Sequence, residues 1–169
     1  MGKIIFLVGF MGSGKSYWGR RLADELDIEF VDLDQWIEAR EGRTIIQLFQ
    51  EKGETAFREL ERDYLREAAE SRFSRVIATG GGAPCFFDNM EWMNNHGQTI
   101  CLNVPVAVLA ERLLPERTKR PLLANLQPVD LENFIKEKLQ LRTSFYNKAK
   151  HIIPWINNEN KYLNLLKSI

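Results

Sequence analysis

Short runs of apolar, often β-branched residues alternate along the chain with stretches in which apolar residues recur every three or four positions. The first pattern predicts strands and the second predicts amphipathic helices. The expected strands are Ile4–Val8, Glu29–Val31, Arg75–Thr79, Thr99–Asn103 and His151–Ile153. The expected helices are Lys15–Leu26, Leu33–Arg40, Ile45–Gln50, Glu54–Ala69, Phe87–Asn95, Pro105–Leu113, Pro128–Lys148 and Glu159–Lys167. This alternation predicts an α/β fold with a parallel sheet and crossover helices.

The stretch from residue 114 to residue 127 interrupts the alternation. It contains Pro115 and Pro121, and its apolar residues show little periodicity. We interpret it as a mobile flap. The basic residues in or next to it are Arg112, Arg117, Lys119 and Arg120. Near a phosphate site, such a segment is well placed to neutralise charge on a transferring phosphoryl group, while the alternative is an ordinary solvated surface.

Composition and charge narrow the class of protein. A length of 169 residues fits a single domain over residues 1–169. Lys and Arg together number 23, as do Asp and Glu, so the formal net charge is zero. Because binding to a phosphate backbone calls for a surplus of positive charge, nucleic acid is not an expected partner. The longest apolar stretch, Ile4–Phe10, is far below the roughly 20 residues of a membrane-spanning helix, so no membrane partner is expected either.

The two cysteines, Cys85 and Cys101, do not form a CxxC pair. We therefore expect reduced thiols that serve packing, in a cytoplasmic protein. The chain shows no heptad repeat and no exposed apolar stripe, so a monomer is the expected state.

The strongest local signal for chemistry is the segment Gly9–Ser16, which reads GFMGSGKS and fits the phosphate-loop pattern GxxxxGK[ST]. The pattern lies between a predicted strand and a predicted helix, as its mechanism requires. Backbone N–H groups and the helix N-terminus bind phosphates, while Lys15 adds a positive charge and the Ser16 hydroxyl can ligate Mg²⁺. The segment predicts binding of a nucleoside triphosphate.

A second pair of candidate residues, Asp32 and Asp34, follows the second predicted strand. In an open parallel sheet, ligands gather at the carboxyl ends of the strands. One of these carboxylates would bind the metal and the other would reach a hydroxyl of the phosphoryl acceptor. The alternative is that one of them only caps the helix that follows.

Candidates for acceptor binding lie further along the chain. Gly80, Gly81 and Gly82 directly follow the third predicted strand and suggest either a close approach of backbone to a ligand or a left-handed turn, while taken alone they are more often an ordinary loop. Arg58 lies beside the apolar stripe of its helix, and taken alone it reads as a surface arginine paired with Glu54 or Glu61. Arg142 lies near the end of the long predicted helix.

Taken together, these motifs resemble shikimate kinases in order and spacing over nearly the whole chain. The resemblance rests on Gly9–Ser16, Asp32-Leu-Asp34, Phe57-Arg58 with Glu61, Gly80–Gly82, Arg120-Pro-Leu-Leu123, and Arg142 four residues before Tyr146. It implies a three-layer sandwich with a five-stranded parallel sheet, helices on both sides and a lid, as in nucleoside-monophosphate kinases. It also implies transfer of the γ-phosphoryl group of ATP to the 3-hydroxyl of shikimate, in the pathway to chorismate and aromatic amino acids.

The resemblance assigns a role to each matching residue. ATP and Mg²⁺ would be held by Gly12, Ser13, Gly14, Lys15, Ser16 and Tyr17, with Ser16 and Asp32 on the metal and Arg112 and Arg120 on the nucleotide. Shikimate would be bound by Asp34, Arg58, Gly80, Gly81, Gly82 and Arg142. Lys15, Asp34 and Arg120 would be catalytic, with Asp34 orienting or deprotonating the attacking hydroxyl. Residues of about 33–61 would form the shikimate-binding region and residues of about 112–124 the lid.

Some positions depart from the family pattern, and other functions compete with this one. Tyr17 replaces the usual threonine after the serine of the phosphate loop, and the adenine-binding loop is poorly matched around Trp155, Asn157 and Asn158. One alternative is another small-molecule kinase of the same class, acting on gluconate-type acids or nucleotides. The other is a nucleotide-binding regulatory module without catalysis, which would be expected to have lost the acceptor-binding residues.

Overall fold

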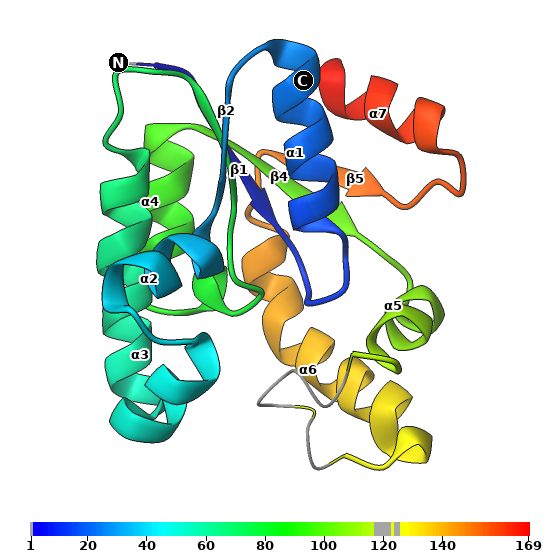
Figure 1. The fold of residues 1–169 in the computed structure, drawn as a ribbon. Coiled ribbons are helices and arrows are strands. Elements are labelled where there is room, and N and C mark those ends of the chain that lie inside the picture. Colours follow the sequence, from blue (N-terminus) through cyan, green and yellow to red (C-terminus); the bar gives the residue numbers. More distant parts are fainter. Residues whose placement is uncertain (1, 117–122, 124–125) are drawn as a thin grey trace.

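The sheet sets the frame of the molecule. The structure is a computed structural model that describes residues 2–116, 123 and 126–169. Its strands are β1 (Ile4–Val8), β2 (Glu29–Asp32), β3 (Arg75–Ala78), β4 (Gln98–Asn103) and β5 (His151–Pro154). They pair in the order β2-β3-β1-β4-β5, and every pair is parallel. β1 reads IIFLV and is buried throughout, as a central strand covered on both faces requires. Figure 1 shows it inside the sheet.

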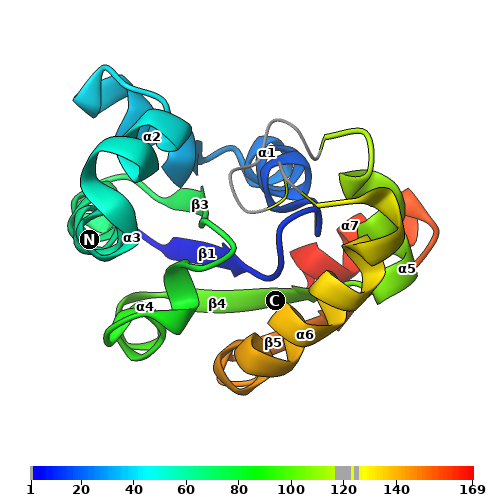
Figure 2. The ribbon, with the colours of Figure 1, turned by 90° about the horizontal axis from the view of Figure 1, so that it is seen from below.

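Helices cover both faces of the sheet. They are α1 (Lys15–Leu26), α2 (Leu33–Glu41), α3 (Ile45–Ala69), α4 (Asn89–His96), α5 (Val106–Leu113), α6 (Leu131–Tyr146) and α7 (Glu159–Lys167), and short 3₁₀ turns lie at Ala83–Cys85 and Pro128–Asp130. One apolar cluster joins α1 and α7 to one face of the sheet, and a larger one joins the other helices to the opposite face. Seen from below, α5 and α6 lie together on one side of β1, and α2 and α3 lie on the other (Figure 2). The expected α/β sandwich is confirmed.

Local signals explain where several helices begin. Thr44 starts α3 with a capping box, in which its hydroxyl accepts from the Gln47 N–H and the Gln47 side chain accepts from the Thr44 N–H. The Asp32 side chain caps α2 by accepting from the backbone N–H groups of Asp34 and Gln35. The first cap fixes the start of α3, and the second fixes the start of the helix that directly follows β2.

α3 consists of two arms that meet at Gly53. The backbone there has φ 77° and ψ 170°, a conformation essentially reserved for glycine, and the helical path changes direction. The arms correspond to the two predicted helices Ile45–Gln50 and Glu54–Ala69. The predicted helix Pro128–Lys148 is wrong at both ends, because its first turn is the 3₁₀ turn and α6 ends at Tyr146.

The expected flap over residues 114–127 falls largely outside the described residues, including Arg117, Lys119 and Arg120. Among the helices that the structure describes, none is both long and apolar enough to cross a bilayer.

Candidate active site

Two adjoining cavities open at the carboxyl edge of the sheet. The first, here the phosphate-loop cavity, has a volume of about 630 Å³ and is lined by the loop after β1, Asp32, Thr79, Arg112, Trp155 and Glu159 among others. The second, here the arginine cavity, has a volume of about 480 Å³. Its walls include Glu38, Thr44, Ile45, Ile46, Phe49, Phe57, Arg58, Glu61, Gly82 and Arg142. The cavities share Met11, Asp34, Gly80, Gly81 and Glu116. A ligand in one would therefore lie against a ligand in the other.

The phosphate loop carries Lys15 at the start of α1. The Lys15 side chain is buried, and its ammonium group donates to the carbonyls of Gly9 at 2.8 Å and Phe10 at 2.9 Å. Gly14, which precedes the helix, has a φ of 91°, so the chain turns sharply and leaves the N-terminus of α1 facing the cavity. Cationic charge and a helix N-terminus on one wall suit a polyphosphate.

Ser16 and Asp32 place two oxygens together on the same cavity wall. The Ser16 hydroxyl donates to Asp32 Oδ2 at 2.5 Å, while Asp32 Oδ1 caps α2. Helix capping, the alternative considered for this carboxylate, therefore holds for one of its oxygens and leaves the other beside Ser16. A hydroxyl and a carboxylate match the oxygen ligands that Mg²⁺ prefers, and Mg²⁺ commonly takes its other ligands from water and substrate phosphates. The described residues include no cluster of three or more acidic, histidine or cysteine side chains around a common point.

Asp34 lies in the first turn of α2, on the wall that the two cavities share. This is where an acceptor hydroxyl would meet a terminal phosphate. Gly80 approaches it closely, since a Cβ at Gly80 would come within 2.4 Å of Glu61 Oε1 and 3.3 Å of Asp34 Oδ1. A side chain there would displace both carboxylates, which explains the first glycine after β3.

Arg58 is buried, at 5% exposure, so the interpretation of it as a surface arginine is wrong. Its guanidinium donates to Glu61 at 2.7 Å and to Glu54 at 3.2 Å, so both expected partners bind at once. Gly82 makes room for it, because a Cβ at Gly82 would lie 2.7 Å from the guanidinium nitrogens. The sequence pattern placed Arg58 beside the apolar stripe of α3, and that side of the helix turns toward the arginine cavity.

Glu61 is a site residue that the sequence did not single out by itself. Its side chain is 1% exposed, pairs with Arg58 and interacts electrostatically with Asp34 and Arg142. Burial raises the pKa of the Glu61 carboxyl from 4.5 to about 7, although Arg58 and Arg142 lower it, and the negative charge of Asp34 adds to the rise. The charge balance of the arginine cavity therefore depends on a carboxyl that titrates near neutral pH.

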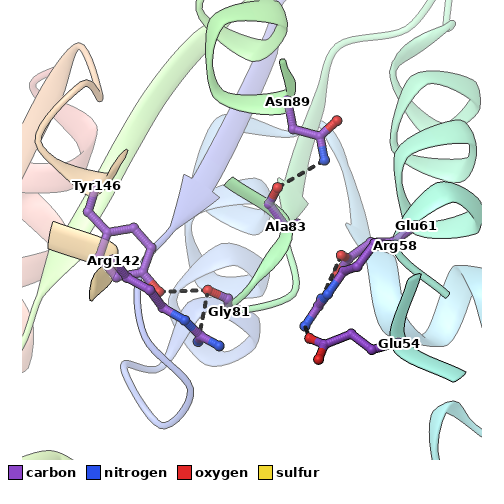
Figure 3. A network of polar contacts seen from close by, with 8 residues as sticks. All are labelled: Glu54, Arg58, Glu61, Gly81, Ala83, Asn89, Arg142 and Tyr146. Carbon is purple, nitrogen blue, oxygen red and sulfur yellow. Dashed lines mark hydrogen bonds and ion pairs between the residues drawn. The ribbon is translucent and has the colours of Figure 1, made fainter. Parts of the chain in front are cut away.

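Arg142 of α6 reaches the same cavity from the far side of the glycine loop, opposite Arg58, and Tyr146 lies beside it on the same helix (Figure 3). Both contact the carbonyl of Gly81, with the Tyr146 hydroxyl donating at 2.6 Å and Arg142 Nη1 at 3.4 Å. The structure thus brings the two predicted arginines, Asp34 and the three glycines together around one cavity.

Arg112 and Tyr17 occupy the outer part of the phosphate-loop cavity. Arg112 donates to the Gly12 carbonyl at 3.0 Å, and its guanidinium carbon lies 4.4 Å from the centre of the Trp155 ring. The Tyr17 hydroxyl donates to Glu159 at 2.9 Å, so this side chain is tied to α7. Ser13 is fully buried in the loop, with its hydroxyl 3.5 Å from the Lys15 ammonium.

Several wall residues carried no individual signal in the sequence. Phe49 and Phe57 pack their rings 4.3 Å apart and line the arginine cavity, although their apolar spacing reads as core. Met11 and Glu116 line both cavities, and neither had an individual signal in the sequence. Arg120, predicted to be catalytic, lies outside the described residues.

A phosphate loop, a Ser–Asp oxygen pair and an adjoining acceptor cavity on this sheet define a P-loop kinase of small molecules. The family model for shikimate kinase matches residues 11–167, and the chain belongs to the shikimate kinase family, whose members phosphorylate shikimate with ATP. This membership confirms the resemblance and disfavours both a gluconate-type or nucleotide kinase and a module without catalysis.

Individual relatives agree over almost the full length. A shikimate kinase of Phocaeicola vulgatus is 51% identical over 157 residues, which are 93% of this chain and 89% of the relative. The crystal structure of shikimate kinase from Bacteroides thetaiotaomicron has a TM-score of 0.92 at 42% identity and covers 98% of this chain and 97% of its own. The solved structure of shikimate kinase from Acinetobacter baumannii in complex with shikimate has a TM-score of 0.89 at 33% identity and covers 99% of this chain and 93% of its own.

The raised pKa of Glu61 predicts a pH dependence of folding stability. Between pH 4.5 and about 7 the folded chain binds a proton at Glu61 that the unfolded chain releases, so this stabilisation is complete below pH 4.5 and is lost as the pH rises through about 7. Its full size is on the order of 3 kcal/mol. We expect the free energy of unfolding, from urea titrations at pH 5 and pH 8, to fall less with pH in Glu61→Gln than in the unaltered chain. Equal pH dependence in both would contradict the assignment.

Proposed function

We propose that this chain transfers the γ-phosphoryl group of ATP to the 3-hydroxyl of shikimate, giving shikimate 3-phosphate and ADP. The observation that carries the proposal is the wall shared by the two cavities. There Asp34 lies between the phosphate loop on one side and the cavity lined by Arg58 and Arg142 on the other. Reactants held in adjoining cavities gain much of their rate from proximity and orientation alone.

On the donor side, Gly12–Tyr17 would hold the ATP phosphates through backbone N–H groups. In the proposed complex the Lys15 ammonium leaves its two loop carbonyls and pairs with the β- and γ-phosphates. Ser16 and Asp32 would hold Mg²⁺, which when bound supplies positive charge to the phosphate oxygens. Arg112, which lies on Trp155, would flank the base, and Arg120 would reach the phosphates from the lid.

On the acceptor side, Arg58 and Arg142 would bind the shikimate carboxylate. Planar guanidinium groups suit this task because they donate two parallel hydrogen bonds. Gly80, Gly81 and Gly82 would contact the substrate through their backbone, and Asp34 would accept a hydrogen bond from the attacking hydroxyl. In a loose transition state the hydroxyl proton leaves late, so a carboxylate that orients the hydroxyl is a sufficient base.

We further propose that residues 1–169 act as one domain and as a monomer, with about 33–61 binding shikimate and about 112–124 forming the lid. A cytoplasmic location is also proposed. It is supported by Cys85 and Cys101, both of which are free thiols, as is usual in a reducing compartment.

A panel of acceptors tests the function. With ATP and Mg²⁺, we expect ADP release in the presence of shikimate and none above background with gluconate or nucleoside monophosphates. Asp34→Asn keeps the shape of the side chain but removes its charge, so we expect turnover to fall by at least about 100-fold. Equal rates with gluconate or a nucleoside monophosphate would overturn the proposal.

Replacing Arg58 tests the binding of the carboxylate. We expect Arg58→Ala to raise the KM for shikimate by about 10- to 100-fold, the value of a hydrogen bond to a charged group, with a smaller change in kcat. Because this change leaves Glu61 buried without Arg58, the double variant Arg58→Ala with Glu61→Gln separates loss of folding from loss of binding. Arg62→Ala is the matched control, since Arg62 lies on the same helix but lines neither cavity. An unchanged KM in the double variant would refute the role of Arg58.

The variant Asp32→Asn tests the proposal that Ser16 and Asp32 hold Mg²⁺. Asparagine retains an oxygen that can cap α2, so the fold should be kept while the negative charge next to Ser16 is lost. We expect half-maximal activity to need several-fold more Mg²⁺ and calorimetric binding of ATP with Mg²⁺ to weaken, with shikimate binding unaltered. Asp24→Asn, an exposed carboxylate on α1, serves as control. An unchanged Mg²⁺ requirement would remove Asp32 from the metal site.

A further inference from the structure

The glycine loop after β3 is held at several points by groups from different elements. Thr79 donates to the carbonyl of Leu7 at the end of β1, through both its N–H and its hydroxyl. Asn89 of α4 donates to the carbonyl of Ala83 at 2.9 Å. Between these two points, the carbonyl of Gly81 is bound from α6 by Tyr146 and Arg142 (Figure 3).

The two contacts to the Gly81 carbonyl differ in strength. The Tyr146 hydroxyl at 2.6 Å makes a short hydrogen bond, whereas Arg142 Nη1 at 3.4 Å is at the long limit. Tyr146 is 5% exposed, and burial raises the pKa of its hydroxyl, which favours the protonated form that can donate. Tyr146 is thus the stronger donor to this carbonyl, while Arg142 makes only a long contact with it and also interacts with the Tyr146 hydroxyl.

Both side chains project from one face of α6, because they are four residues apart. The guanidinium of Arg142 is also limited on another side by the ring of Phe10, 5.5 Å away. Without the Tyr146 hydroxyl, the nearest described donor to the Gly81 carbonyl is Arg142 itself. The guanidinium would then move onto the carbonyl and away from the arginine cavity.

We propose that Tyr146 is a positioning residue for the acceptor: its hydroxyl holds the Gly81 carbonyl, which fixes the glycine loop between the two arginines and leaves Arg142 available to an acceptor carboxylate. The proposal rests on the proposed function, since it assumes that Arg142 binds the carboxylate of the substrate. It assigns Tyr146 no contact with the substrate.

The test is Tyr146→Phe, which removes one oxygen and keeps the ring. We expect the KM for shikimate to rise by about three- to tenfold, the value of one hydrogen bond, while the KM for ATP changes by less than about twofold. The matched control is Tyr162→Phe, because Tyr162 is fully buried and its hydroxyl has no hydrogen-bond partner in the part of the chain that the structure describes. Calorimetric titration with shikimate should show the same loss of affinity for Tyr146→Phe only.

A second substrate separates positioning from a general loss of packing. An analogue in which the carboxylate of shikimate is replaced by a hydroxymethyl group has no anion for Arg142. We therefore expect Tyr146→Phe to lower kcat/KM for shikimate and to leave that for the analogue nearly unchanged. Equal losses on both substrates, or an unaltered KM for shikimate, would overturn the proposal. If the unaltered chain did not phosphorylate shikimate at all, the proposed function would fail instead.

Discussion

The site depends on the register of three parallel strands. Ala78 of β3 pairs with Leu7 of β1 on one side and with Asp32 of β2 on the other. The phosphate loop, the aspartate pair and the glycine loop therefore leave the sheet at the same height. Because parallel strands point their carboxyl ends to one edge, the three segments converge there although they are far apart in the sequence. A shift of one residue in any of these pairings would turn Asp32 or the glycine loop away from the cavities.

Charged side chains are concentrated at this edge of the sheet, and those that are buried need partners of opposite charge. Among the described residues, two arginines and four carboxyl groups line one cavity, the carboxyl groups being those of Asp34, Glu38, Glu61 and Glu116. A buried ion pair by itself adds little to stability, since desolvation offsets most of the Coulomb attraction. The Arg58–Glu61 pair is therefore better understood as a contact that holds the guanidinium of Arg58 in place on the cavity wall. The raised pKa of Glu61 reflects the free-energy cost of removing its carboxylate from water.

Much of the fold was predictable because its signals are local. All five strands were located to within one residue, since each is a short apolar run bounded by turn residues. The phosphate loop, Asp32, Asp34 and the glycine loop were predictable because each directly follows a strand. Arg58 and Glu61 could not be predicted as buried site residues when each was considered alone. Their spacing is that of an ordinary surface ion pair, and only the packing of α3 against the glycine loop shows that they are buried.

Tyr146 illustrates a second kind of contact that the sequence does not reveal, a hydrogen bond from a side chain to the backbone. Its partner is the backbone of Gly81, and a hydrogen bond to a carbonyl leaves no mark on the type of the partner residue. The family resemblance includes this tyrosine by its place after Arg142, yet its contact became visible only in three dimensions. The same is true of Phe49, whose spacing reads as core but whose ring lines a cavity.

The break at Gly53 has a consequence for how the acceptor wall can vary. Along a continuous α-helix each residue adds about 100° of rotation, so an insertion before Arg58 would swing Arg58 and Glu61 around the axis. Since the helical phase ends at Gly53 and starts afresh at Glu54, the first arm is rotationally independent of the second. Residues 45–50, which contribute Ile45, Ile46 and Phe49 to the wall, can therefore change in number while the guanidinium of Arg58 keeps its direction.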